Sequence, residues 1–210
     1  MKKHLNVFFI CSVLMAGALT QLGCSEPKGM NRIESIVLRD GDTAATLELP
    51  AAYMAKKVTS GFAQFDCQYP NMQPTVNKVE VSDMTVNILL GHSLKSHAEM
   101  TIEQAHSDRF DPNRPGAVYR NGTKGEYQVF LSGNPVSDPK GFSTYYLFKA
   151  KDNQWVQVEW SDWSEIYMVD RQMNPDVSVR YWFRKSKGTD FIHVDEIVTK
   201  FIKAHLKLQH

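Results

Sequence analysis

Apolar and polar residues alternate with a period of two along much of the chain, a pattern typical of strands that bury one face. The clearest case is 84–90, where Met84, Val86, Ile88 and Leu90 would share one face. The same reasoning predicts further strands at 32–39, 46–49, 61–67, 117–120, 126–131, 144–150, 155–160, 166–170 and 178–184. From 117 onward these strands follow one another closely, so we expect an antiparallel meander.

Turn-forming residues join the later strands into three hairpins. Asn121-Gly122 precedes the strand at 126–131, and this dipeptide accepts the positive φ of a tight turn. Residues 151–154 and Asn174-Pro175-Asp176 separate the other two pairs. Connections this short favour antiparallel neighbours.

Helical character is confined to short stretches and to the C-terminal end. Pro50 suits the start of a helix and predicts one or two helical turns at 51–57, and 98–106 could form another short helix. Asp195 is expected to cap a final helix whose apolar stripe comprises Ile197, Val198, Phe201, Ile202 and Leu206. The pattern predicts the α+β class, an antiparallel meander sheet with a C-terminal amphipathic helix packed on it.

The first 23 residues differ from the rest of the chain. Lys2 and Lys3 precede an apolar run at 7–19, and Leu22-Gly23-Cys24 follows it. This is the three-part layout of a secretory signal peptide. The run of about 13 residues is shorter than the roughly 20 that a membrane-spanning helix needs, so we expect residues 1–23 to be cleaved off.

Leu22-Gly23-Cys24 resembles the lipobox of bacterial lipoproteins, in which a small residue precedes the modified cysteine. The resemblance implies a diacylglyceryl group on the Cys24 sulfur and a third acyl chain on its new amine, which together would hold the protein firmly on a membrane. Ser25 stands where lipoproteins retained in the inner membrane usually carry Asp, which implies the periplasmic face of the outer membrane. A cleaved signal without lipid and an uncleaved anchor are the alternatives.

Cleavage would leave residues 24–31 as a lipidated tether and 32–210 as a single domain. Loss of Lys2 and Lys3 leaves 22 basic and 23 acidic residues, so no overall field favours nucleic acid as a partner. Of the three cysteines, Cys11 would leave with the signal and Cys24 would carry the lipid. Cys67 then has no internal disulfide partner, and we expect it to be a small buried residue.

Residues 89–95 offer one candidate for catalysis. Their sequence resembles the nucleophile elbow of α/β-hydrolases, Gly-x-Ser-x-Gly, with Ser93 as the nucleophile. Gly91 fits the first glycine, but Lys95 occupies the place of the second, and no series of βα units precedes Ser93. An envelope serine hydrolase is therefore an alternative only. Its site would have to be completed by a histidine such as His193 and an acid such as Asp162 or Asp170.

No cofactor and no metal site is predicted. His92, His97 and His106 are close in sequence, but the step of five residues from His92 to His97 does not place both on one helix face. Asp40-Gly41-Asp42 lacks the remaining ligand positions of a calcium loop. The chain has neither a Gly-rich phosphate loop nor a Cys-x-x-Cys pair.

An acidic, aromatic stretch is the most informative local feature. Residues 152–176 hold six acidic residues and one basic residue, Arg171, and all four tryptophans lie in or beside this stretch. At protein interfaces aromatic rings supply contact area and charges steer association. The residues predicted to contact a partner are Glu159, Asp162, Trp163, Glu165 and Asp170. The alternative is that the tryptophans belong to the core and the acids to the solvated surface.

These features favour a lipid-anchored periplasmic interaction protein with no catalysis of its own. In general character the chain resembles the small periplasmic lipoproteins that act as immunity partners of secreted antibacterial toxins, such as type VI secretion lipases. That resemblance implies occlusion of the toxin's active site. We expect contact with the membrane through the lipid, a toxin or an envelope component as protein partner, and no nucleic acid. A structural or assembly lipoprotein is the remaining alternative.

Overall fold

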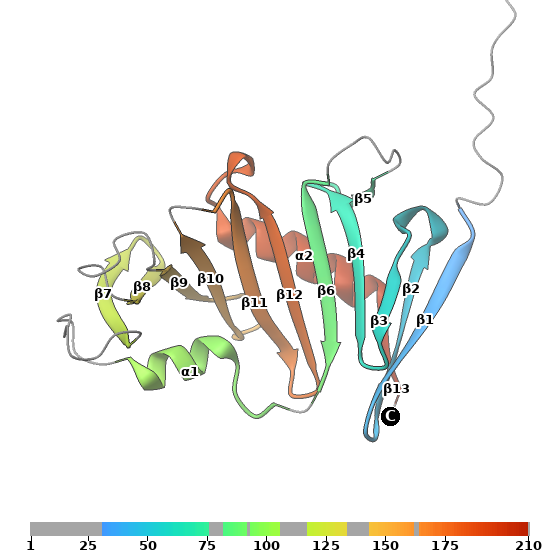
Figure 1. Ribbon diagram of the computed structural model, residues 1–210, viewed down its shortest axis with the longest axis horizontal. Coiled ribbons are helices and arrows are strands. Elements are labelled where there is room, and N and C mark those ends of the chain that lie inside the picture. The colour runs from blue at the N-terminus through green and yellow to red at the C-terminus, as the bar shows by residue number, and fades with distance from the viewer. Residues whose placement is uncertain are drawn as a thin grey trace, which may run out of the picture.

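A large antiparallel sheet forms the centre of the molecule (Figure 1). The computed structural model describes residues 31–75, 82–91, 93–105, 117–133, 143–161 and 164–209. The sheet has the strand order β3-β4-β6-β12-β11-β10-β9-β8-β7, and β5 pairs with β4 outside this path. Its strands are β3 (Lys56–Thr59), β4 (Phe62–Gln68), β5 (Gln73–Pro74), β6 (Met84–Leu90), β7 (Val118–Lys124), β8 (Tyr127–Ser132), β9 (Ser143–Lys149), β10 (Trp155–Ser161), β11 (Ile166–Asn174) and β12 (Val177–Arg184).

A smaller sheet stands at the β3 end of the large one. It consists of β1 (Ile33–Asp40), β2 (Thr43–Pro50) and β13 (Leu206–Gln209), with β2 in the middle. The last strand of the chain therefore completes the sheet that the first two strands begin. Two short 3₁₀ helices, η1 (Ala51–Tyr53) and η2 (Lys185–Lys187), connect neighbouring elements.

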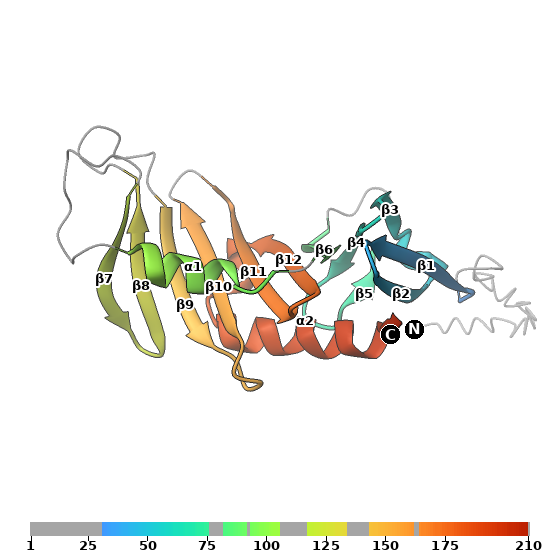
Figure 2. The ribbon, with the colours of Figure 1, turned by 90° about the horizontal axis from the view of Figure 1, so that it is seen from below.

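The two α-helices lie on opposite faces of the large sheet (Figure 2). The longer one, α2 (Phe191–His205), covers the face that carries the main core, and the shorter one, α1 (His97–Gln104), packs on the other face. We call these the α2-side face and the α1-side face. Neither helix combines the length and apolar character that crossing a membrane would require, in the part of the chain that the structure describes.

Strand alternation builds the core on the α2-side face. Successive side chains of a strand point to opposite faces, so cross-strand partners gather into rows. In one row Phe65 pairs with Val86, Val86 with Tyr181, and Tyr181 with Val169. The apolar stripe of α2 seals these rows with Phe191, Val194, Val198 and Ile202, all of which are buried.

A capping box and a small second core hold α1 in place. The Ser96 hydroxyl accepts a hydrogen bond from the Glu99 amide, and the Glu99 carboxylate accepts one from the Ser96 amide. Ala98 packs in a cluster with Phe130 of β8 and Leu147 of β9. The Thr101 hydroxyl donates a 2.6 Å hydrogen bond to the Gln157 side chain of β10.

The predicted α+β class is confirmed, including the C-terminal helix packed on an antiparallel sheet. The prediction of helical turns across 51–57 is wrong beyond η1, because Lys56–Thr59 forms β3 at the edge of the large sheet. Asn121-Gly122 does not form the first hairpin turn. It lies in an irregularity of the β7–β8 ladder between Arg120 and Thr123, and Gly122 supplies the positive φ there.

The helix cap is a second correction. α2 begins at Phe191, and the Asp190 side chain accepts the capping hydrogen bond from the His193 amide. Asp195, the predicted cap, lies inside the helix and is buried. Asp190 and Asp195 both lie near the start of this helix, and only Asp195 packs against the neighbouring sheet.

Because Ile202 is 1% exposed and lies in the main core, Ile202→Ala should lower the free energy of unfolding by about 2–5 kcal/mol. Lys200→Ala, on the exposed side of the same helix, should change it by less than about 0.5 kcal/mol. Urea unfolding followed by tryptophan fluorescence measures both. Equal losses in the two variants would show that α2 does not pack on the sheet by this stripe.

Candidate functional site

Part of the α1-side face is not covered by any described helix. The helix α1 packs against β10 and β11, and its core cluster reaches β8 and β9, whereas β12, β6 and β4 carry no helix on this side (Figure 1). We call this region the open face. Its side chains alternate with the core residues of the same strands, and they are Phe62, Gln64, Asp66, Thr85, Asn87, Leu89, Met168, Arg180 and Trp182.

Polar side chains form a row across the open face. Gln64 is the cross-strand partner of Asn87, and Asn87 is the partner of Arg180. Arg180 in turn pairs with Asp170, whose Oδ1 accepts a 2.9 Å hydrogen bond from the Arg180 Nε. A row of this kind on the α2-side face would be costly, because buried charges and amides need partners. At the centre of the row Asn87 is 4% exposed, and its Oδ1 has no hydrogen-bond partner among the described residues.

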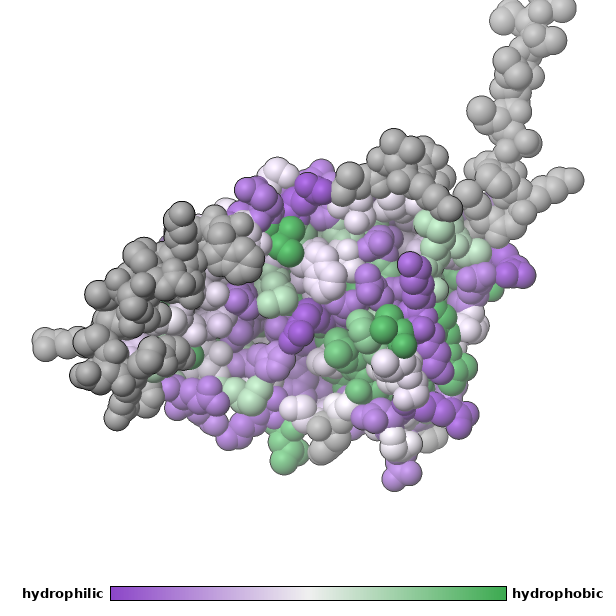
Figure 3. All heavy atoms as spheres, in the orientation of Figure 1, coloured by the Kyte–Doolittle hydropathy of each residue, from purple (hydrophilic) through white to green (hydrophobic). Residues whose placement is uncertain are grey.

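Apolar and aromatic side chains flank the polar row. Phe62 and Leu89 are cross-strand partners and are half-buried, and Trp182 pairs with Met168 in the same way. Figure 3 shows apolar side chains gathered on this side of the molecule over β3, β4 and β6. Half-exposed rings and aliphatic groups beside hydrogen-bonding groups are the composition of a protein-binding surface.

The structure brings two of the five predicted contact residues to this face. Glu159 is the cross-strand partner of Met168, and Asp170 is the partner of Arg180. Glu165 is exposed in the connection between β10 and β11. Asp162 and Trp163, like Cys24, the residue predicted to be lipidated, lie outside the described residues.

Internal pairing neutralises much of the acidic stretch. Asp170 is shared by Arg180 and by His97, whose Nδ1 lies 3.2 Å from Oδ1. Burial alone would raise the pKa of Asp170, but the hydrogen bonds from His97 and Arg180 lower it below its ordinary value. The charge count along the sequence could not reveal this, because both partners come from segments outside 152–176. Asp170 is therefore paired within the domain and is not a free carboxylate that awaits a partner protein.

Tryptophans divide between the two faces. Trp182 belongs to the open face, whereas Trp155 packs beside the α1 cluster and Trp160 beside the main core. The Lys185 ammonium lies 4.9 Å from the Trp160 ring centroid and covers it. Each of these three rings is half-buried, so the alternative that tryptophans serve the core holds in part.

Ser93 does not have the geometry of a nucleophile elbow. Its hydroxyl donates a 2.7 Å hydrogen bond to the Lys95 carbonyl, and its amide donates to the Pro175 carbonyl. His97 and Asp170 border the same hollow of about 100 Å³, but His193, the predicted base, is in α2 on the other side of the sheet. An elbow turns directly from strand to helix on a strained residue, whereas α1 begins four residues after Ser93.

Metal-binding clusters of three or more His, Cys, Asp or Glu side chains are not present among the described residues. His92 and His106 lie outside them. Cys67 is fully buried, as predicted, and its thiol is 3.8 Å from the Met72 sulfur. Burial raises the pKa of the Cys67 thiol to about 12, which leaves it protonated and unreactive at neutral pH.

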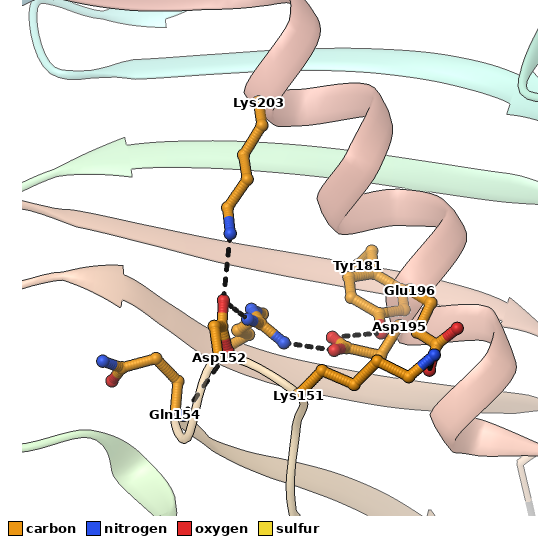
Figure 4. A network of polar contacts seen from close by, with 8 residues as sticks. Lys151, Asp152, Gln154, Tyr181, Asp195, Glu196 and Lys203 are labelled. Carbon is orange, nitrogen blue, oxygen red and sulfur yellow. Dashed lines mark hydrogen bonds and ion pairs between the residues drawn. The ribbon is translucent and has the colours of Figure 1, made fainter.

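A buried ionic network, which sequence reasoning missed, fastens α2 to the sheet (Figure 4). Arg171 of β11 lies in an apolar row between Val179 and Val156, and its side chain is 2% exposed. One guanidinium nitrogen bonds to Asp195 of α2 and another to Asp152 of the β9–β10 turn. The only sequence signal was the break in alternation at Arg171, an arginine where β11 needs a core residue.

Further hydrogen bonds extend the network. The Tyr181 hydroxyl donates to Asp195 over 3.2 Å, and Lys203 reaches Asp152 over 3.1 Å. Burial raises the pKa of Asp195 to about 6 in spite of the attraction of Arg171. For Asp152, burial is outweighed by Lys203 and Arg171, so its pKa is lowered. A hollow of about 400 Å³ adjoins the network, and its ionic groups are mostly paired with one another.

Comparisons with known proteins add no family to this geometry. A scan against protein-family models, a search of curated proteins and a search of solved structures each gave no match to the chain.

Removal of one partner of the buried pair should be severe. Arg171→Met leaves the Asp195 carboxylate buried without its counterion, and should lower the free energy of unfolding by about 3–5 kcal/mol. The double variant Arg171→Met/Asp195→Leu should recover most of that loss, since apolar groups of similar size can replace a buried pair. Urea unfolding of the three proteins measures this. A double variant as unstable as the single one would contradict the account.

The raised pKa of Asp195 predicts a pH dependence with a definite sign. The folded state binds the proton more tightly than the unfolded chain, so this contribution is full below about pH 4 and is lost as pH rises through about 6. The slope is at most about 1.4 kcal/mol per pH unit. Because the pKa of Asp195 is roughly 4 in the unfolded chain and about 6 in the folded protein, Asp195→Asn should flatten the plot of unfolding free energy against pH between about pH 4.5 and 6.5.

His97 must be controlled for in that measurement. Its hydrogen bond to Asp170 raises its pKa, so its contribution has the same sign and is lost at somewhat higher pH. The Asp195→Asn comparison is therefore made in a His97→Gln background. If the slope persists without both groups, neither of them is its source.

Proposed function

We propose that this protein is a lipid-anchored interaction protein of the cell envelope, which binds another protein and performs no catalysis itself. The sequence supports the anchor through the signal-like segment and Leu22-Gly23-Cys24. The observation that carries the binding role is the open face, where half-buried apolar and aromatic side chains lie beside a row of polar groups. The other face of the same sheet is sealed by α2.

The open face is preorganised for a partner. Its strands are central in the sheet and are paired on both sides, so their side chains are held in fixed positions. The Arg180–Asp170 ion pair and the Thr85–Asp66 hydrogen bond fix the polar groups further. A surface that is already ordered loses little conformational entropy on binding, and this favours affinity.

The contacts suggest how binding would work. Trp182, Phe62 and Leu89 would supply the buried contact area, and Arg180 with Glu159 would set the orientation of the partner. If the partner is a secreted toxin, a sheet face of this size would block the toxin's active site by covering it. The lipid would keep the domain at the membrane where such a toxin acts. An envelope component is the other partner that this surface would suit.

The binding role is tested by capture from envelope extract with the tagged, full-length lipoprotein as bait. The variant Leu89→Ser/Trp182→Ala should reduce recovery of one stoichiometric partner by about tenfold or more, because buried aromatic anchors dominate interface energies. Trp160→Ala is the matched control, since it removes a half-buried ring next to the opposite face. Circular dichroism verifies that both variants are folded.

A second variant locates the interface. Asp162→Lys/Trp163→Ala changes the predicted residues outside the described part, so loss of the partner in this variant alone would move the site to that connection. Retention of the partner by all three variants would rule out both surfaces.

A genetic test distinguishes the two kinds of partner. If the gene can be deleted only when a neighbouring toxin gene is also deleted, the protein has an immunity role. A permeability defect independent of any toxin would assign an assembly role.

A further inference from the structure

The start of the described chain lies at one end of the long axis of the molecule. β1 begins at Ile33 and stands at the end opposite β7 (Figure 1). Only nine positions separate Ile33 from Cys24. A segment of that length can span at most about 30 Å. A lipid on Cys24 therefore keeps β1 within a short distance of the bilayer.

Exposed apolar side chains concentrate at this end. Six large apolar residues are exposed in the described part of the chain, and four of them lie between positions 33 and 58. They are Ile33 (56% exposed), Val37 (38%), Met54 (53%) and Val58 (50%). Single exposed apolar residues are ordinary on protein surfaces, whereas a group beside a lipid attachment point is not explained by chance exposure alone.

Two strands bring part of this group together. Ile33 and Val37 are both on the outward face of β1, four positions apart along the strand. The Lys57 ammonium donates a 2.7 Å hydrogen bond to the Val37 carbonyl, which places β3 beside β1. Val58 follows Lys57 at an irregularity of the β3–β4 pairing and is half-exposed there. We call Ile33, Val37 and Val58 the tether-side patch.

We propose that the tether-side patch contacts the membrane surface that holds the Cys24 lipid. The inference rests on the lipid anchor of the proposed function and adds a second, weaker membrane contact to it. The side chains would enter the boundary between headgroups and acyl chains, as exposed aliphatic residues do at interfaces. Lys56 and Lys57 directly precede Val58 and are exposed, and ammonium groups beside an apolar patch suit lipid phosphates.

A patch of three side chains would bind a membrane only weakly by itself. The anchor makes the contact intramolecular, so a contact that is weak on its own is favoured by the short distance to the bilayer. Weak contact is then enough to select one orientation of the domain. In that orientation the small sheet rests on the bilayer, and the end of the large sheet that carries β7 points away from it.

Site-specific labelling tests the contact on the full lipoprotein. The chain offers a clean background, because Cys11 would be removed, Cys24 lipidated and Cys67 is buried. A bimane label on Val58→Cys is compared with one on Glu126→Cys, an exposed turn position between β7 and β8. The proteins are reconstituted in phosphatidylethanolamine–phosphatidylglycerol vesicles that contain doxyl-labelled lipid. The label at position 58 should be quenched about threefold more than the label at position 126.

A charge variant separates the patch from the anchor. Ile33→Asp/Val37→Asp in the Val58→Cys background should reduce quenching to the level of position 126, while the protein still floats with the vesicles. If the protein floats but the labels at positions 58 and 126 are quenched equally, the proposed membrane contact of the tether-side patch is wrong, and the anchor is unaffected. Failure to float, with a mass that shows no acyl groups on Cys24, overturns the anchor and the patch together.

Discussion

The structure depends on one buried ionic contact between Arg171 and Asp195. It joins β11 in the centre of the large sheet to α2, and it fixes the position of the helix along the strands in a way that apolar packing alone does not. Desolvation makes such a pair expensive, and an equally large apolar pair could be as stable. The charges favour one position of α2 along the strands, the position in which Asp195 contacts both Arg171 and the Tyr181 hydroxyl.

That fixed helix separates the roles of the two sheet faces. On the α2-side face the rows are mostly apolar and are covered by α2, so this face is used to build the core. On the α1-side face the row from Gln64 to Asp170 is polar, and its Arg180–Asp170 end is ion-paired, with His97 of α1 also contacting Asp170. The protein can therefore leave a large part of a central sheet uncovered without losing its core. An exposed but rigid surface is the result.

Much of the fold was predictable from local pattern, and the site was less so. The period of two at 84–90 and the stripe of α2 each depend on burial of one face, which sequence records directly. The pairing of Asp170 with His97 and Arg180 depends on segments that are distant along the chain, and no local count of charge reveals it. The sequence pattern predicted Asp195 as the helix cap, whereas Asp190 is the cap in the structure. Only contact with Arg171, 24 positions away, decides which acid is buried.

The position of β13 links the two ends of the chain. This strand follows α2 directly and pairs with β2, so the sheet that β1 and β2 begin is completed by residues 206–209. Without β13, the β1–β2 hairpin would have an unpaired edge on β2. A chain truncated after α2 would carry that open edge permanently, and would present it to proteases and to other strands.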